Sequence, residues 1–394
     1  MMNKEGVRIP SIDLLRGVVM IIMVLDHARD YFHADAFLYD PLDLSRASAG
    51  LFFTRWITHF CAPVFVFLAG TSAYLVGRRK GASELSFFLL TRGLWLIVLE
   101  LTVVNFGWFF NLRFPFIALQ VIWAIGVSML ALSLMVRLPF KVILITGLVL
   151  VFGHNLLDSV HFPGTGIGSF LWALLHDQSY FPLGGDRGVF VAYPLLPWVG
   201  TMALGYCLGA IYTDAFPAMR RQRLLIALGI GALVLFVVIR LINAYGDPVP
   251  WSEQRTPLYT FLSFLNTTKY PPSLLYLLMT LGPSLLFLAF SEKQPSALAQ
   301  KAIVFGRVPL FYYVMHIFVL HFIATIGAVM TGHSVWTMIF DTWVTMSQEL
   351  TGYGFGLPVV YLVWIGVVVV LYPVSRWYER YKTANRKKIW LSYV

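Results

Sequence analysis

The sequence has little charge and almost no cysteine. Only 12% of its 394 residues are charged and 58% are hydrophobic, whereas an average soluble domain carries about 25% charged residues. This composition excludes an ordinary soluble domain and indicates an integral membrane protein. The two cysteines, Cys61 and Cys207, both fall in apolar runs, which argues against a disulfide framework. The chain also lacks an internal repeat and a glycine-rich phosphate motif, so we expect one domain over residues 1–394.

Apolar runs of about 20 residues recur along the whole length, which is typical of membrane-spanning helices rather than of a β-barrel. The sequence therefore predicts an all-α fold, a polytopic membrane helix bundle with about ten transmembrane helices. The predicted spans are residues 11–31, 52–76, 87–110, 115–136, 140–157, 191–213, 224–244, 270–290, 304–327 and 357–378. Residues 334–347 are expected to form an interfacial or re-entrant helix. The basic and apolar start of the chain is similar to a signal peptide, but nine spans follow, so we expect the first helix to be uncleaved.

The basic residues are distributed unevenly over the predicted loops. With the N-terminus placed in the cytoplasm, 19 of the 29 Lys and Arg residues fall on the cytoplasmic side and seven fall outside. This bias predicts that both termini are cytoplasmic. It also assigns the net charge of +10 to membrane orientation and anionic lipid rather than to nucleic acid. All nine histidines lie in the outer half or near mid-membrane, which suggests chemistry near the outer face.

The first predicted helix carries two functional-looking side chains on one face. Arg16 and His27 are eleven residues apart, so they lie about 20° past three full turns and about 16–17 Å apart along the axis. A guanidinium binds phosphate well, and histidine is the natural general base at neutral pH. The pattern fits a long ligand with phosphates at one end and a reactive group at the other, such as a coenzyme A thioester. The alternative is that Arg16 reaches the lipid headgroups and His27 is an interfacial cap.

Further ionisable residues surround this pair. Asp30 follows His27 by three residues and is expected to orient its ring, whereas Asp26 is expected to pair with Arg29. Charged and polar groups inside an apolar helix are costly and usually functional. His59, in the second predicted span at a similar depth, is a second catalytic candidate, the alternative being a buried structural histidine.

The remaining histidines do not indicate a metal site. No His-x-x-x-His pair falls on a span, and His316 and His321 would lie about 140° apart around a helix. His316 shares a helix face with Tyr312 near mid-membrane. It is either a site residue or a helix–helix hydrogen bond, and we favour the hydrogen bond.

Three stretches are similar to a known family. IPSIDLLRGVVMIIMVLDHARDYF (9–32), FFTRWITHFCAPVFVFLAGTSAYL (52–75) and FGRVPLFYYVMHIFVLH (305–321) resemble the bacterial membrane acyltransferase family related to heparan-α-glucosaminide N-acetyltransferase. The resemblance implies a single transmembrane acyltransferase domain in a bacterial inner membrane. It implies acetyl-CoA as the donor and a glucosamine-like acceptor on the other side of the membrane.

The resemblance also implies roles for individual residues. Arg16-x10-His27 resembles a motif of bacterial membrane O-acyltransferases, which implies that Arg16 binds acyl-CoA and that His27 is catalytic. The active histidine of the lysosomal enzyme lies slightly beyond the first core helix, so His33 competes with His27. That enzyme also has an N-terminal luminal domain, which we expect to be absent here.

The sequence thus predicts an enzyme that moves an acetyl group from cytoplasmic acetyl-CoA to an amine or hydroxyl of an envelope sugar. Direct transfer and an acetyl-histidine intermediate both remain open. The expected partners are acetyl-CoA, a sugar or glycan and membrane lipid, with a homodimer left open and no nucleic acid. The main alternative is a transporter or flippase for a polar lipid or sugar, although the inverted repeat common in transporters is not visible.

Overall fold

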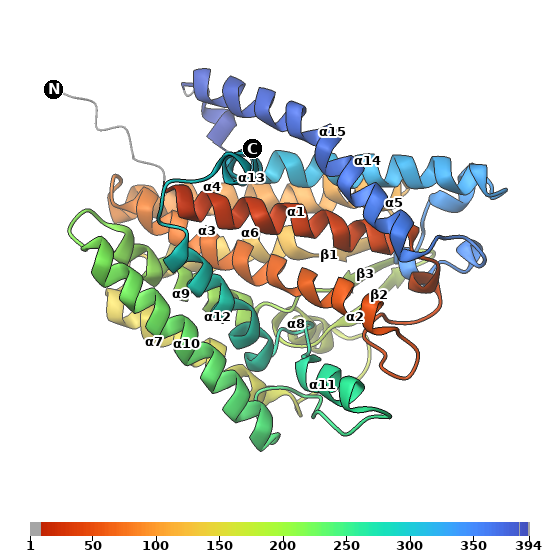
Figure 1. Ribbon diagram of the computed structural model, residues 1–394, viewed down its shortest axis with the longest axis horizontal. Coiled ribbons are helices and arrows are strands. Elements are labelled where there is room, and N and C mark those ends of the chain that lie inside the picture. Colours follow the sequence, from red (N-terminus) through yellow and green to blue (C-terminus); the bar gives the residue numbers. More distant parts are fainter. Residues whose placement is uncertain (1–8, 386, 393–394) are drawn as a thin grey trace.

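The computed structural model describes residues 9–385 and 387–392, which form a helical bundle with one small sheet (Figure 1). The α-helices are α1 (Pro10–Phe32), α2 (Ala49–Trp56), α3 (Cys61–Gly77), α4 (Ala82–Leu99), α5 (Asn105–Phe109), α6 (Val121–Met135), α7 (Phe140–Gly153), α8 (Ile167–Leu175), α9 (Leu196–Leu208), α10 (Ala218–Ile242), α11 (Pro257–Leu265), α12 (Leu274–Phe290), α13 (Ala297–Arg307), α14 (Pro309–Met330) and α15 (Leu357–Ala384). Among the short turns, η2 (Ile57–Phe60) joins α2 to α3, and the π-helical turn η3 (Glu100–Val104) joins α4 to α5.

Each of the ten predicted spans contains a helix. Within the described part of the chain, six helical segments are long and apolar enough to cross a membrane: Ala49–Gly77, Ala82–Phe109, Phe140–Leu157, Ala218–Ile242, Pro309–Met330 and Leu357–Ala384. Three further apolar helices are shorter, namely Val121–Met135, Leu196–Tyr212 and Leu274–Phe290. Helix α1 is long enough but carries five charged residues. The structure therefore supports a membrane helix bundle, with six of the ten helices meeting both the length and the composition expected of a crossing.

The prediction of an all-α fold is wrong at one place. Residues 116–119 form strand β1 (Phe116–Leu119), which pairs in parallel with β3 (Arg187–Val191), and β3 pairs antiparallel with β2 (Ser179–Gly184). Phe114 has a left-handed backbone, with φ of 51°, and residues 116–119 are extended in β1, so α6 begins only at Val121. Helix α6 is therefore shorter than the predicted span 115–136.

Two other predictions need correction. The predicted span 304–327 is divided, because Val308 leaves the helical region and Pro309 starts a new helix, α14. The interfacial helix predicted over residues 334–347 is only two short 3₁₀ turns, Val335–Met338 and Val344–Met346.

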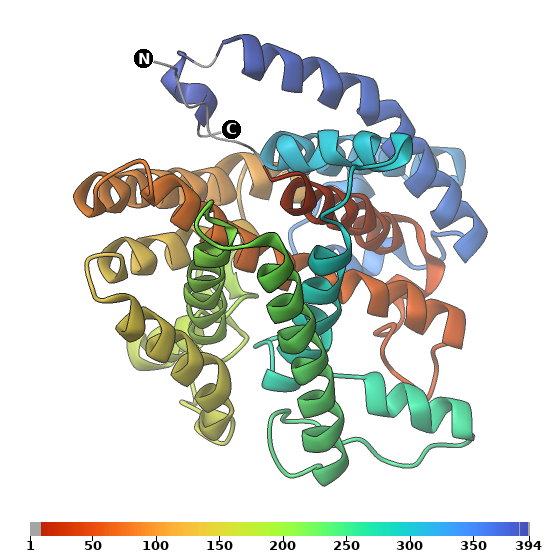
Figure 2. The same ribbon diagram turned by 60° about the vertical axis from the view of Figure 1, so that its left-hand side comes forward.

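Helix α1 lies inside the bundle, while α10 and α15 lie on its surface. Sixteen of the 23 residues of α1 are buried. By contrast, only 22% and 17% of the apolar windows of α10 and α15 are buried. Figure 2 shows α15 running along the outside. An apolar helix face that the protein leaves uncovered is expected to contact lipid.

The start of α1 and the end of α15 lie at the same end of the bundle. Arg307, at the end of α13, pairs with Asp13 of α1 at 3.4 Å and with Glu379 of α15 at 2.6 Å. We call this the basic end, because Arg16 and Lys382 also lie there. The opposite end, where α1 finishes at Phe32, is called the far end.

Glycines allow α1 to touch α13 backbone to backbone. A Cβ atom added at Gly17 would lie 1.9 Å from the carbonyl oxygen of Ala302, and one added at Gly306 would lie 1.9 Å from that of Asp13. Such reciprocal small-residue contacts are typical of membrane helix pairs, where close packing replaces the hydrophobic effect. The contact leaves no room for any side chain at either position.

We expect Gly17→Ala to lower the stability of the protein, because the added methyl group meets backbone that cannot rotate away. Overpacking of this kind typically costs about 1–3 kcal/mol. The matched control is Gly366→Ala in α15, where nothing lies within 4 Å of the added Cβ and where alanine favours the helix by up to about 1 kcal/mol. Thermal unfolding in detergent measures both, and equal midpoints for the two variants would contradict the proposed contact.

Candidate active site

A cavity of about 270 Å³ opens at the basic end between α1, α3, α4, α6 and the α13–α14 junction. Among the described residues, four cationic side chains line it, those of Arg16, Arg92, Arg307 and Lys382. The other lining residues are mainly apolar, and no carboxylate is among the described residues of the wall. We call this the basic cavity. It combines a positively charged opening with an apolar interior.

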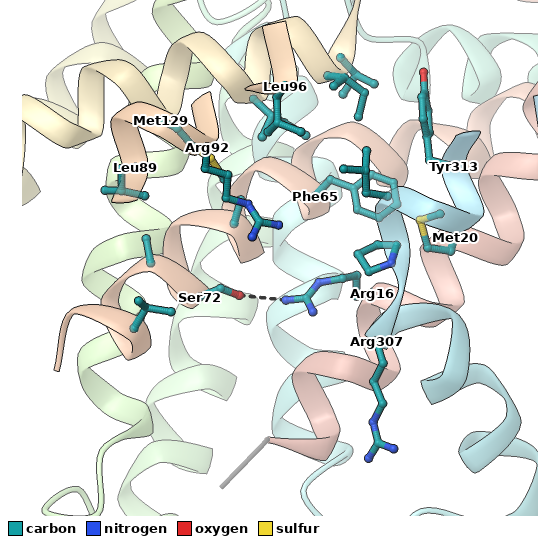
Figure 3. A pocket seen from close by; sticks show the side chains of 18 of the residues that line it. Arg16, Met20, Phe65, Ser72, Leu89, Arg92, Leu96, Met129, Arg307 and Tyr313 are labelled. Carbon is teal, nitrogen blue, oxygen red and sulfur yellow. Dashed lines mark hydrogen bonds between the residues drawn. The ribbon is translucent and has the colours of Figure 1, made fainter. Parts of the chain in front are cut away.

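Arg16 is held in a fixed orientation at this opening. Its guanidinium donates to Ser72 Oγ at 2.9 Å and to the Gly306 carbonyl at 3.1 Å, and it pairs with Asp13 at 3.3 Å (Figure 3). In Figure 3 the side chains of Arg16 and Arg92 point toward one another across the cavity. Two guanidinium groups facing one space repel each other, so an anion between them would be favourable.

The inner part of the basic cavity reaches the side chain of Tyr313 on α14. The Tyr313 ring centre lies 6.3 Å from that of His27 and 5.5 Å from that of His316. Trp108 packs edge-on against His27 at 4.7 Å. Tyr313 therefore lies in the wall of the cavity and is also a ring neighbour of the predicted catalytic histidine.

His27 is buried on α1 and hydrogen-bonded to another histidine. Its Nδ1 lies 2.7 Å from Nε2 of His316, with the two rings nearly parallel at 11°. The helix–helix hydrogen bond favoured for His316 is thus confirmed, with His27 as its partner. Among the described residues, no hydrogen bond reaches Nε2 of His27. Nδ1 is therefore the ring nitrogen of His27 that the described structure holds by a hydrogen bond.

Asp30 does not orient His27, contrary to the prediction from their i, i+3 spacing. Its carboxylate pairs instead with Arg29 at 2.5 Å. A guanidinium attracts a carboxylate more strongly than a neutral imidazole does, so Arg29 takes the interaction that was predicted for His27.

Asp26 lies at the centre of a buried charge cluster. Its carboxylate contacts Arg55 at 2.7 Å, Arg29 at 2.9 Å, the Thr58 hydroxyl at 2.9 Å and Lys269 at 3.8 Å. The predicted Asp26–Arg29 pair is therefore confirmed. We call these five residues the Asp26 cluster. It joins α1 to α2, η2 and the segment before α12, and so fixes the part of α1 that carries His27.

The other two histidine candidates lie in different surroundings. His59 on η2 is fully buried, and neither ring nitrogen has a hydrogen-bond partner within the described chain. His33 caps the end of α1, where its Nδ1 accepts from the Asp35 backbone N–H at 3.2 Å. Partial burial lowers the pKa of the His33 imidazole. No hydrogen bond joins His59 or His33 to His27 in the described structure.

Sequence reasoning missed several residues of the site. Arg92, Trp108 and Tyr313 belong to helices whose orientation a single periodic pattern does not reveal.

Glu100 is fully buried in the π-helical turn η3, where it accepts the Trp123 backbone N–H at 2.9 Å at the start of α6. Within the described residues, no group of three His, Cys, Asp or Glu side chains is arranged to hold a metal ion.

The apolar outer helices define a membrane protein, and the basic cavity inside its helix bundle is a candidate ligand site. Residues 8–240 match the family described as heparan-alpha-glucosaminide N-acetyltransferase, catalytic. Because this match covers more than half of the chain, the protein belongs to that family, as the sequence resemblance predicted. A comparison with curated proteins gives no match.

Together, the family and the six apolar helices indicate a membrane-embedded acetyltransferase. The matched residues include Arg16, His27 and Arg92 but end before α14. His316, Tyr313 and Arg307 therefore enter the site from a part of the chain that the family match does not cover.

Proposed function

We propose that the protein transfers an acetyl group from acetyl-CoA to an amine or hydroxyl of a sugar in the cell envelope. The observation that carries the proposal is the basic cavity, which is lined by four cations and by Tyr313, a ring neighbour of His27. In this proposal the protein lies in a bacterial inner membrane, with its basic end and both termini in the cytoplasm.

The basic cavity suits the two chemical parts of acetyl-CoA. Its phosphates would pair with Arg16, Arg92, Arg307 and Lys382, since guanidinium and phosphate form strong charge-assisted hydrogen bonds. The pantetheine arm would follow the apolar wall along α1. Because Arg16 and His27 share one helix face about 16–17 Å apart, the thioester would arrive near His27.

His27 then acts as the general base. Its Nε2 takes the proton of the acceptor N–H or O–H while the acceptor attacks the thioester carbonyl carbon. The new C–N or C–O bond forms, the C–S bond breaks, and the imidazolium returns its proton to the CoA thiolate. In the variant route, Nε2 itself attacks the carbonyl to give an acetyl-histidine, which the acceptor then cleaves.

Oriented membrane vesicles test the proposal as a whole. Inside-out vesicles should consume added radiolabelled acetyl-CoA and place the label on a sugar in their interior, whereas sealed right-side-out vesicles should not. Equal consumption by both kinds would contradict donor entry from the cytoplasm. Movement of a sugar or lipid without any use of acetyl-CoA would instead favour the transporter.

His27→Ala should lower kcat by about 10²–10⁴-fold, the usual contribution of a general base, while the purified protein still binds acetyl-CoA. His33→Ala is the matched control, because His33 caps the same helix without contacting His27. Steady-state turnover in detergent measures both. Loss of activity in His33→Ala together with normal turnover in His27→Ala would assign the base to His33.

Arg16→Ala should raise the KM for acetyl-CoA by about 10- to 100-fold, since a charge-assisted hydrogen bond contributes about 1.5–3 kcal/mol. The kcat should change much less, because phosphate binding is remote from the reacting atoms. Arg16→Lys should recover part of the affinity, as it keeps the charge but loses the planar fork.

Arg79→Ala is the control for Arg16, because Arg79 is an exposed cation outside the basic cavity. Direct binding of radiolabelled acetyl-CoA gives the affinities without relying on turnover. An equal loss of affinity in Arg79→Ala and Arg16→Ala would mean that general surface charge, rather than the cavity, attracts the donor.

A further inference from the structure

The hydrogen bonds around His316 fix where its protons lie. Its Nδ1 is 3.0 Å from the backbone carbonyl oxygen of Tyr312, one turn earlier on α14. A carbonyl oxygen can only accept, so Nδ1 of His316 must carry the hydrogen. The opposite tautomer would place the Nδ1 lone pair against the carbonyl lone pairs, which is repulsive.

The direction of the next hydrogen bond follows from the first. A neutral imidazole with hydrogen on Nδ1 has a lone pair on Nε2, so His316 accepts at that nitrogen. Nε2 of His316 lies 2.7 Å from Nδ1 of His27. His27 must therefore donate from Nδ1, and its own lone pair lies on Nε2. This is the nitrogen that no other described residue contacts by a hydrogen bond.

We propose that His316 is the positioning residue for His27, holding the tautomer in which Nε2 is free to take a proton from the acceptor. The proposal rests on the proposed function and names a role for a residue outside the family match. His316 acts through His27 and does not itself meet the reacting atoms.

The packing around the two rings supports this role. His316 is fully buried and lies nearly parallel to His27, while Trp108 packs edge-on against His27. The His27 ring therefore has neighbours that limit its rotation. When Nε2 gains a proton, the Nδ1–H of the resulting imidazolium donates a stronger, charge-assisted bond to His316.

A neutral partner also suits this location. Many functional histidines donate to a carboxylate, but the nearby carboxylates Asp26 and Asp30 are both paired with Arg29. An additional carboxylate would bring a further buried charge, which is expensive in a membrane interior. An imidazole supplies the acceptor without that charge.

Three substitutions of His316 separate its functions. His316→Gln keeps an acceptor near the position of Nε2, His316→Asn keeps a donor near Nδ1 but loses that acceptor, and His316→Ala loses both. We expect His316→Asn and His316→Ala to lower kcat by about 10- to 100-fold, as for other partners that orient a functional histidine. We expect the KM for acetyl-CoA to be unchanged and His316→Gln to recover most of kcat.

His321→Asn is the matched control on the same helix. His321 is equally buried, but its ring nitrogens face the backbone carbonyls of Gly107 and Met338 rather than His27. The His321→Asn substitution should lower thermal stability but should change kcat less than His316→Asn does. If His316→Gln is as inactive as His316→Ala, or if His321→Asn loses as much kcat as His316→Asn, the positioning role is refuted.

A spectroscopic measurement tests the proposal independently of acetyl transfer. Nitrogen NMR of histidine-labelled protein, with His27→Gln used to assign the signal, reports which His27 nitrogen carries the hydrogen. We expect hydrogen on Nδ1 in the unmodified protein and a mixture of tautomers in His316→Ala. Hydrogen on Nε2 in the unmodified protein would overturn the proposal. If the unmodified protein carries hydrogen on Nδ1 of His27 but shows no acetyl transfer, the pairing of His27 with His316 is upheld and the proposed function fails.

Discussion

The backbone contact between Gly17 and Gly306 is the constraint on which the site depends. It sets α1 directly against α13, and the adjacent Arg16 then donates to the carbonyl of Gly306. Since a helix is stiff over three turns, a position fixed at residue 17 also limits where His27 can lie ten residues later. At the far end, the Asp26 cluster holds the same helix through Arg55 and Lys269. Arg16 and the predicted base, His27, are thus placed by contacts at the two ends of one helix.

Electrostatics explains why the predicted base is partnered by a histidine. A buried carboxylate must be paired, and removing one partner of a buried ion pair is strongly destabilising. Asp26 and Asp30 both meet this need through Arg29. Neither carboxylate hydrogen-bonds to His27, and α14 supplies His316 instead. The ionised groups next to His27 in the sequence therefore have a structural role, while its hydrogen-bond partner comes from a distant helix.

The sequence alone predicted two features that lie within one helix. The common face of Arg16 and His27 and the pairing of Asp26 with Arg29 follow from helical geometry over one to three turns. The break before Pro309 and the late start of α6 were not predicted, because the predicted spans 304–327 and 115–136 ran through both places. Contacts between distant segments were not predictable in this way. The pairing of β1 with β3, the approach of Lys269 to Asp26 and the bond between His27 and His316 all depend on how the helices pack.

The wide separation of His27 and His316 along the chain has a consequence for biosynthesis. Arg55 follows Asp26 by only 29 residues, but His316 follows His27 by 289. At about 5–20 residues per second, the ribosome needs roughly 15–60 s to make that interval. Throughout this time α1 carries a polar ring whose partner does not yet exist. The imidazole pair therefore forms late in synthesis. If a nascent chain stalls before α14 is made, α1 is already in the membrane but His27 lacks its hydrogen-bond partner.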